Sequence, residues 1–189
     1  MTEQELLAKY DRGERIKGDS SEHVLMHKMS EEVRKLLHEL NDSYHTDSET
    51  REIMSRIVGY ELDDGFSLFT PFYSDCGKNI HIGRRVFINA CCQFQDQGGI
   101  YIGDDVLIGH GVMLLTLNHG KLPEERHDLL PKAIHIGNNV WIGSGTVVLP
   151  GVTIGDNAII GARSLVTKDI PANMIAIGSP AKPYKSIYD

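Results

Sequence analysis

The sequence predicts a mainly β protein, a stack of triangular coils of parallel strands preceded by a helical segment at the N-terminus. The first observation is a six-residue period that begins near Ile82 and runs without interruption over residues 136–171. The second is a change of texture, because residues 1–60 show the spacing of amphipathic helices instead. We therefore expect two parts, a helical cap over 1–60 and a β domain over 61–189.

Helices are expected in the N-terminal part because start and stop signals frame its apolar positions. Two threonines are each followed three residues later by glutamate, which is the capping-box pattern. Between them, apolar residues recur every three or four positions, as on one face of an amphipathic helix. The boundary residues are Thr2 with Glu5, Ser20 or Ser21, Asn41 and Asp42, Thr46 with Glu49, and Gly59.

The six-residue period has a physical interpretation. A large aliphatic residue at position one and a smaller residue at position five are expected to point inward, while glycine or another small residue at position two allows a tight corner. Three sixes close one triangular coil, and neighbouring coils stack as parallel strands about 4.8 Å apart. An α/β sheet with repeated Ile-Gly turns is the alternative, which six consecutive matches disfavour. The uninterrupted sixes begin at Ile136, Ile142, Val148, Ile154, Ile160 and Val166.

Composition excludes several classes of protein. The formal net charge of −7 argues against a nucleic-acid-binding protein, which is normally basic. Apolar runs are too short for a bilayer span, and the first residues contain no apolar stretch like that of a signal peptide. Cys76, Cys91 and Cys92 form neither a disulfide framework nor a C-x-x-C motif. We expect a cytoplasmic protein that binds neither nucleic acid nor membrane.

The repeat fails between Met113 and Ile136, which predicts an inserted loop at about 115–133. Loops longer than about 12–15 residues in a compact domain are usually functional or disordered. His119 lies near the start of this loop, and the imidazole pKa suits proton transfer near neutral pH. From the residues alone, a solvent-exposed loop histidine is an equally good interpretation, and we give His127 only that one.

Three motifs resemble the maltose, galactoside and related sugar O-acetyltransferases, which are hexapeptide-repeat proteins. The motifs are NIHIGRR at 79–85, IGNNVWIGSG at 136–145 and PGVTIGDNAIIGARSLVTKDIPANMIAIGSPAK at 150–182. The resemblance covers most of the chain and is weakest before about residue 60. It implies a left-handed parallel β-helix, an exception to the usual right-handed crossover. It also implies acetyl transfer from acetyl-CoA to a sugar or glycoside hydroxyl, a homotrimer with intersubunit active sites, and no metal.

The resemblance also implies site residues. His119 matches the family's general base, although Gly120 stands where the family often has proline. Three residues match acceptor contacts, namely Asp75, Asn89 and Asp96. Seven match the acetyl-CoA site, namely Trp141, Ser144, Gly161, Ala162, Thr167, Lys168 and Lys182.

Structural alternatives stay open for four of these residues. Asp96 could cap the 97–99 turn. Asn89 could be a corner residue with a left-handed backbone. Trp141 could serve packing, and Lys168 could be an exposed corner lysine. We assign Asp19 no role, because the resemblance needs a gap there.

Three other functions compete with sugar acetylation. An acyltransferase acting on serine or an amine would share the loop histidine and the CoA end. A non-catalytic trimeric binding module would need neither of them. A zinc carbonic anhydrase on the same β-helix would need two histidines five residues apart, but His110 is followed at that spacing by Leu115.

Overall fold

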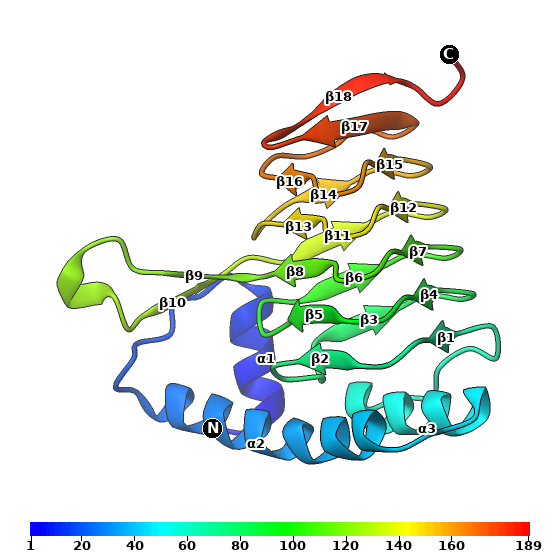
Figure 1. Ribbon diagram of the computed structural model, residues 1–189. Coiled ribbons are helices and arrows are strands. Elements are labelled where there is room, and N and C mark those ends of the chain that lie inside the picture. Colours follow the sequence, from blue (N-terminus) through cyan, green and yellow to red (C-terminus); the bar gives the residue numbers. More distant parts are fainter.

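The computed structural model describes residues 1–189 as a three-sided β-helix that stands on a layer of helices (Figure 1). Helix α1 (Glu3–Asp11) lies along the side of the lower coils, while α2 (Ser21–Asp42) and α3 (Asp47–Val58) run beneath them. No helix combines the length and the apolar composition that crossing a bilayer requires. Because α2 and α3 lie beneath the coils, the layer of helices closes the lower end of the β-helix.

The predicted helix boundaries are confirmed by the hydrogen bonds at the helix ends. Thr2 forms a complete capping box with Glu5, and Thr46 forms another with Glu49. Gly59 ends α3 with a φ of 89°, a left-handed backbone conformation that costs glycine little. Local sequence signals were thus sufficient to define this part of the chain.

Strands of successive coils form three sheets. Sheet 1 runs β1 (Ser67–Leu68), β4 (Phe87–Ile88), β7 (Leu107–Ile108), β12 (Trp141–Ile142), β15 (Ile159–Ile160), β17 (Met174–Gly178) and β18 (Ala181–Ser186). Sheet 2 runs β2 (Phe72–Ser74), β5 (Cys92–Gln95), β8 (Met113–Leu115), β13 (Val147–Val148) and β16 (Leu165–Val166). Sheet 3 runs β3 (Ile80–Ile82), β6 (Ile100–Ile102), β11 (Ile134–Ile136) and β14 (Thr153–Ile154). All neighbours in these sheets are parallel except β17 and β18, which pair as an antiparallel hairpin at the upper end.

Three corners connect the sheets. The first corner joins sheet 1 to sheet 2, the second joins sheet 2 to sheet 3, and the third returns to sheet 1 in the next coil. Only the second corner of the β8 coil departs from this plan. There the chain forms a hairpin of β9 (Leu117–His119) and β10 (Leu129–Pro131) with a 3₁₀ turn, η1 (Pro123–Glu125), at its tip.

Inward-pointing residues form one continuous core. The first and fifth residues of the uninterrupted sixes are buried as predicted, with none more than 4% exposed. Each buried aliphatic side chain contributes about 1.5–3 kcal/mol relative to exposure. Cys92 belongs to the same core, whereas Cys91 is exposed.

Two positions of each six have special backbone requirements at the corners. Glycine at position two is required by close stacking, since a Cβ on Gly103 would lie 2.8 Å from the backbone of Gly137 in the next coil. The left-handed residue is at position four, as at Asn139 (φ 54°) and Asn157 (φ 61°). In the coil that contains Asn89, the left-handed residue is Cys91 (φ 66°). The prediction that Asn89 could have a left-handed backbone is therefore wrong.

Replacing Ile142 with alanine should lower the free energy of unfolding by about 2–5 kcal/mol, because Ile142 is fully buried between neighbouring coils. Denaturant unfolding followed by circular dichroism measures this change. Val24 is 70% exposed, so Val24→Ala should change stability by less than about 0.5 kcal/mol. Equal losses in the two variants would contradict the assignment of the core.

Candidate functional site

The interrupted repeat forms an ordered hairpin, which we call the arm (residues 117–131). It leaves the coils at the second corner and projects well beyond them (Figure 1). His119 lies at the end of β9, opposite Leu129 of β10. Its side chain is exposed and forms no hydrogen bond within the chain. The arm therefore presents an imidazole that is free to meet another molecule.

Hydrogen bonds on both sides of Gly120 fix the peptide that follows His119. The Gly120 amide donates to the Asp128 carbonyl oxygen at 3.2 Å, and the Gly120 carbonyl accepts from Arg126 Nε at 3.1 Å. A Cβ at this position would overlap the carbonyl oxygen of Glu125. Position 120 therefore requires glycine, because the two sides of the arm pack too closely there for a Cβ.

The N-terminal segment before α2 holds the arm at its base. Asp128 accepts hydrogen bonds from the Gly18 amide at 2.9 Å and from Arg15 Nε at 2.6 Å. These bonds hold the pKa of Asp128 below its usual value, the Gly18 amide contributing most. Ile16 and Leu129 exchange backbone hydrogen bonds of 3.0 and 2.8 Å. No motif in the sequence predicted these contacts between the N-terminal segment and the arm, which we call the clamp. The only signal for them was the cluster of charges in the loop.

Asp75 lies at the second corner, just after β2. Its exposed carboxylate faces a cavity of about 500 Å³ between this corner and α2, where Lys28 and Arg34 form part of the wall. Desolvation by the surrounding protein raises the pKa of Asp75, while a hydrogen bond from Gln97 Nε2 at 3.4 Å opposes that shift. A carboxylate in this position can accept hydrogen bonds from a ligand hydroxyl.

Asp96 does not line that cavity, and the direct acceptor contact expected for it stays a prediction. It has no exposed surface, and its Oδ1 accepts hydrogen bonds from Ser74 Oγ at 2.7 Å and from the amides of Asp75 and Cys76 at 3.2 and 2.9 Å. Burial raises the pKa of its carboxyl. The Asp96 carboxylate thus holds the turn that carries Asp75, and its backbone carbonyl accepts from the Gly99 amide at 2.9 Å across the 97–99 turn. Its buried Oδ2 has no hydrogen-bond partner.

The first corner holds a different group of expected site residues. Asn89 follows β4, Ser144 follows β12, and Gly161 and Ala162 follow β15, so they form a column along one edge of the β-helix. His110, which sequence reasoning gave no role, occupies the same column between Asn89 and Ser144. Trp141 lies on sheet 1 and is 53% exposed, so about half of its surface remains open to a ligand or another chain.

The remaining cofactor candidates lie at the upper end of the molecule. Thr167 and Lys168 follow β16 at the second corner, and Lys182 is in β18. Both lysines are exposed. This exposure is compatible both with a contact to the cofactor and with the alternative that Lys168 is an ordinary corner lysine. They supply positive charge near the end of an otherwise acidic chain.

The expected site residues are therefore divided between two edges of the chain. Asn89 is at the first corner, whereas Asp75 and the base of the arm are at the second. Sheet 2 therefore lies between Asn89 and His119 of the same chain, and the two side chains are on different edges of the β-helix. No group of three or more His, Cys, Asp or Glu side chains is placed to hold a metal ion.

Comparison with known proteins finds relatives over most of the chain. Residues 133–168 match the family described as bacterial transferase hexapeptide (six repeats). The galactoside O-acetyltransferase of Escherichia coli (strain K12) is 41% identical over 156 residues, which make up 82% of this chain and 77% of that protein.

Solved structures show the same similarity. A maltose O-acetyltransferase from Clostridium difficile 630 superposes with a TM-score of 0.87 at 35% identity, covering 98% of this chain and 97% of that one. A galactoside acetyltransferase in complex with coenzyme A superposes with a TM-score of 0.82 at 34% identity, covering 99% of this chain and 92% of that one. These similarities confirm the predicted fold class, a left-handed parallel β-helix with an N-terminal helical segment.

Replacing Asp128 with alanine should loosen the arm, because the Gly18 amide loses its acceptor and the Arg15 guanidinium keeps only Glu125. Backbone amides of residues 13–20 and 117–131 should then exchange hydrogen several-fold faster, as measured by mass spectrometry. Glu124 is exposed at the tip of the same arm and forms no hydrogen bond or ion pair, so Glu124→Ala is the matched control. Unchanged exchange in Asp128→Ala would show that the clamp does not hold the arm.

Proposed function

The chain belongs to the hexapeptide-repeat acetyltransferases, and from that premise we propose that it transfers an acetyl group from acetyl-CoA to a hydroxyl of a sugar or glycoside. The observation that most strongly supports this reaction is an exposed histidine, His119, at the end of an ordered strand on the arm. Relatives named galactoside and maltose O-acetyltransferase support the class of acceptor, and a related structure in complex with coenzyme A supports the donor.

His119 acts as the general base in this proposal. A ring nitrogen takes the proton from the acceptor hydroxyl, and the hydroxyl oxygen attacks the thioester carbonyl carbon. The tetrahedral intermediate carries a negative oxygen, which needs a preorganised hydrogen-bond donor. Its collapse breaks the carbon–sulfur bond, and the proton on His119 passes to the departing thiolate. A positioned base contributes about 10²–10⁴-fold to the rate, and holding both substrates together contributes much of the rest.

Two sets of residues bind the substrates. Asp75 and Asn89 contact acceptor hydroxyls, and Asp96 supports them by holding the turn of Asp75. The pantetheine arm of acetyl-CoA lies along the first corner beside Ser144, Gly161 and Ala162, where small residues allow close approach. The outer surface beside this corner carries Trp141, near the reacting thioester. The phosphate and adenosine end meets Thr167, Lys168 and Lys182.

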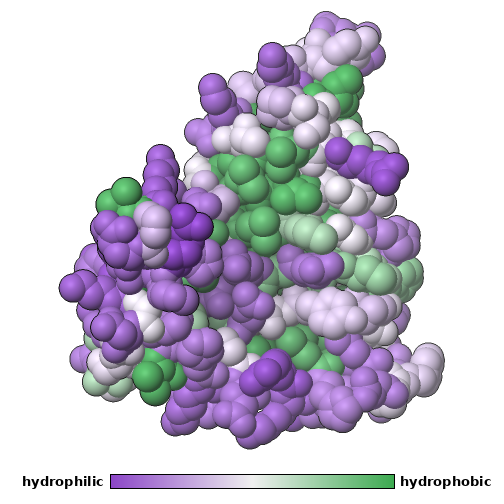
Figure 2. All heavy atoms as spheres, turned by 60° about the vertical axis from the view of Figure 1, so that its left-hand side comes forward, coloured by the Kyte–Doolittle hydropathy of each residue, from purple (hydrophilic) through white to green (hydrophobic).

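The complete site requires a second copy of the chain. Sheet 2 separates the two corners, and its outer surface carries a partly exposed apolar patch, visible as the green area above the arm in Figure 2. Burying this patch between copies would bring the first corner of one chain beside the second corner of another. Such a contact joins two different surfaces, which allows repeated copies to close into a ring, and we propose a ring of three chains, a trimer. The patch consists of Met113, Leu115, Val147, Leu149 and Leu165.

A reducing, cytoplasmic environment is also part of the proposal. Cys76, Cys91 and Cys92 are all unpaired, and Cys91 is exposed. Exposed free thiols are typical of compartments that keep cysteines reduced.

Replacing His119 with alanine should lower kcat about 10²–10⁴-fold while leaving acetyl-CoA binding unchanged, because only the base is lost. Thiol release from acetyl-CoA measures the rate with a panel of sugars and glycosides, together with serine and a simple amine. His127→Ala is the control on the same arm. An unchanged rate in His119→Ala would rule out the assigned base, and release with serine or the amine alone would favour the other acceptors.

Mixing two inactive variants should restore activity if the site lies between chains. His119→Ala and Asn89→Ala are each expected to be slow, but a mixed oligomer contains some sites with both native residues. Unfolding and refolding the two variants together should recover up to about a quarter of the native rate. Activity of the mixture no higher than the mean of the two separate variants would place both residues in one chain.

A further inference from the structure

A cavity lies at the lower end of the first corner, and Asn89 is the one residue of the proposed site that lines it. It has a volume of about 420 Å³ and lies between the turn that joins α2 to α3 and the first corner of the lowest coils. Tyr44, His45 and Asp47 line the side of the turn, while Phe69, Asn89 and His110 line the side of the coils. We call it the turn pocket.

We propose that the turn pocket is a second carbohydrate subsite, which binds the part of a glycoside acceptor remote from the hydroxyl that is acetylated. This rests on the proposed function, because Asn89 is the residue that links the pocket to the reacting sugar. The preferred acceptor is then a disaccharide or a glycoside with a ring-sized aglycone, and a free monosaccharide fills only part of the site.

The turn that forms one wall is fixed before any ligand arrives. His45 Nε2 lies 2.8 Å from the Glu39 carbonyl oxygen and 3.1 Å from Ser43 Oγ, which ties the turn to the end of α2. At the other end, Thr46 starts α3 with its capping box. A wall held by hydrogen bonds at both ends loses little conformational entropy on binding, which favours a specific site.

The side chains in the turn pocket match the chemistry of a sugar ring. Tyr44 and Phe69 are 89% and 54% exposed, and they offer apolar ring surfaces to the carbon–hydrogen face of a pyranose. Phe69 is held edge-to-face against Phe87, with ring centroids 5.2 Å apart. Asp47 supplies carboxylate acceptors. Asn89 Oδ1 is occupied by the Ala90 amide at 2.9 Å, so the Asn89 NH₂ group remains to donate to a hydroxyl.

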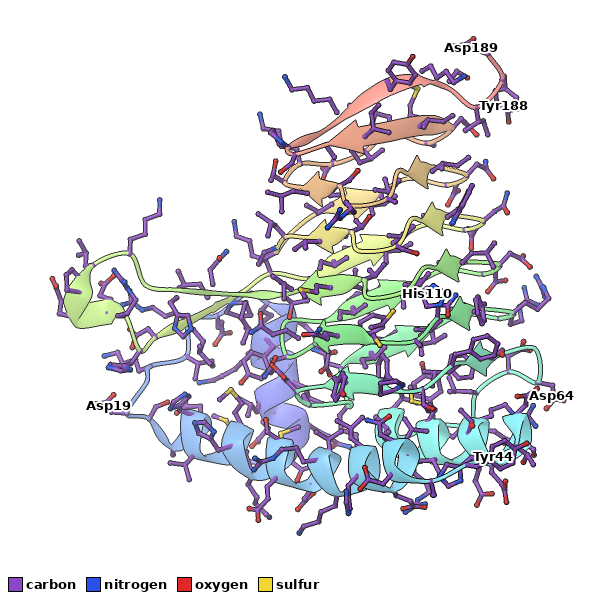
Figure 3. The ribbon with its side chains drawn as sticks, in the orientation of Figure 1. Asp19, Tyr44, Asp64, His110, Tyr188 and Asp189 are labelled. Carbon is purple, nitrogen blue, oxygen red and sulfur yellow. The ribbon has the colours of Figure 1, made fainter.

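The turn pocket and the proposed acetyl-CoA site lie at different heights along the first corner. Ser144 and Ala162 lie above His110, whereas the turn pocket extends below it toward the helices. Figure 3 shows Tyr44 on the turn and His110 on the coils above it, both toward the right of the view, whereas the arm projects to the left. A volume of about 420 Å³ is within the range of small-molecule sites, about 300–1,000 Å³. The pocket is therefore available to the acceptor while acetyl-CoA is bound.

Acceptor length tests the subsite. The native enzyme should acetylate a disaccharide or an aryl glycoside with a kcat/KM about tenfold or more above that of the matching monosaccharide. Tyr44→Ala should remove most of this advantage and leave the monosaccharide kcat/KM and the acetyl-CoA KM unchanged, because Tyr44 touches only the remote unit. Asp47→Asn provides a second variant that keeps the size of the side chain. Tyr188→Ala, at a site 78% exposed near the C-terminus, is the matched control.

The outcomes separate this inference from the reaction itself. Acetylation of mono- and disaccharides at equal kcat/KM, unaffected by Tyr44→Ala, would overturn the subsite and leave the proposed function intact. A rise in the acetyl-CoA KM of Tyr44→Ala would assign the pocket to the cofactor and also overturn it. Failure of every sugar and glycoside to accept the acetyl group would overturn the proposed function, and the subsite with it.

Discussion

Each coil of this protein can bury its inward side chains only against the coils above and below it. Ile108, Ile142 and Ile160 form one such column, each paired in register with the next. A shift of one residue would turn the column outward, so the register is strongly specified. Every residue at a corner is therefore held at a fixed height and on a fixed edge of the β-helix.

This rigidity explains why the candidate site residues are divided between two edges of the chain. Because the corners cannot move toward each other, Asn89 and Asp75 stay on opposite sides of sheet 2. Only the arm departs from the repeat. It is held by polar contacts through Asp128 and Arg126 and by Leu129, which is buried in a small apolar cluster with the N-terminal helices, outside the core of the coils. In the proposed function, activity therefore depends on assembly and on the position of the arm, and the stability of a single coil stack supplies neither.

Buried polar groups near the proposed site shape its surface without being part of it. Asp96 resembles a substrate ligand in sequence, yet all hydrogen bonds of its carboxylate go to Ser74 and the two residues that follow. A buried carboxylate is costly unless it is hydrogen-bonded, and Oδ1 of Asp96 meets this need by ordering a turn. The half-buried His45 likewise orders the turn beside the second proposed subsite.

The sequence by itself determined the repeat, the inward residues, the helix caps and the interruption that carries His119, because each depends on local spacing along the chain. The motif resemblance added the family and the candidate site. Only the tertiary structure decided that Asp96 is buried, that Arg15 and Gly18 hold Asp128, and that Asn89 and His119 lie on different edges. Those facts depend on contacts between residues 20 to 113 positions apart, and no local pattern encodes which distant groups will meet.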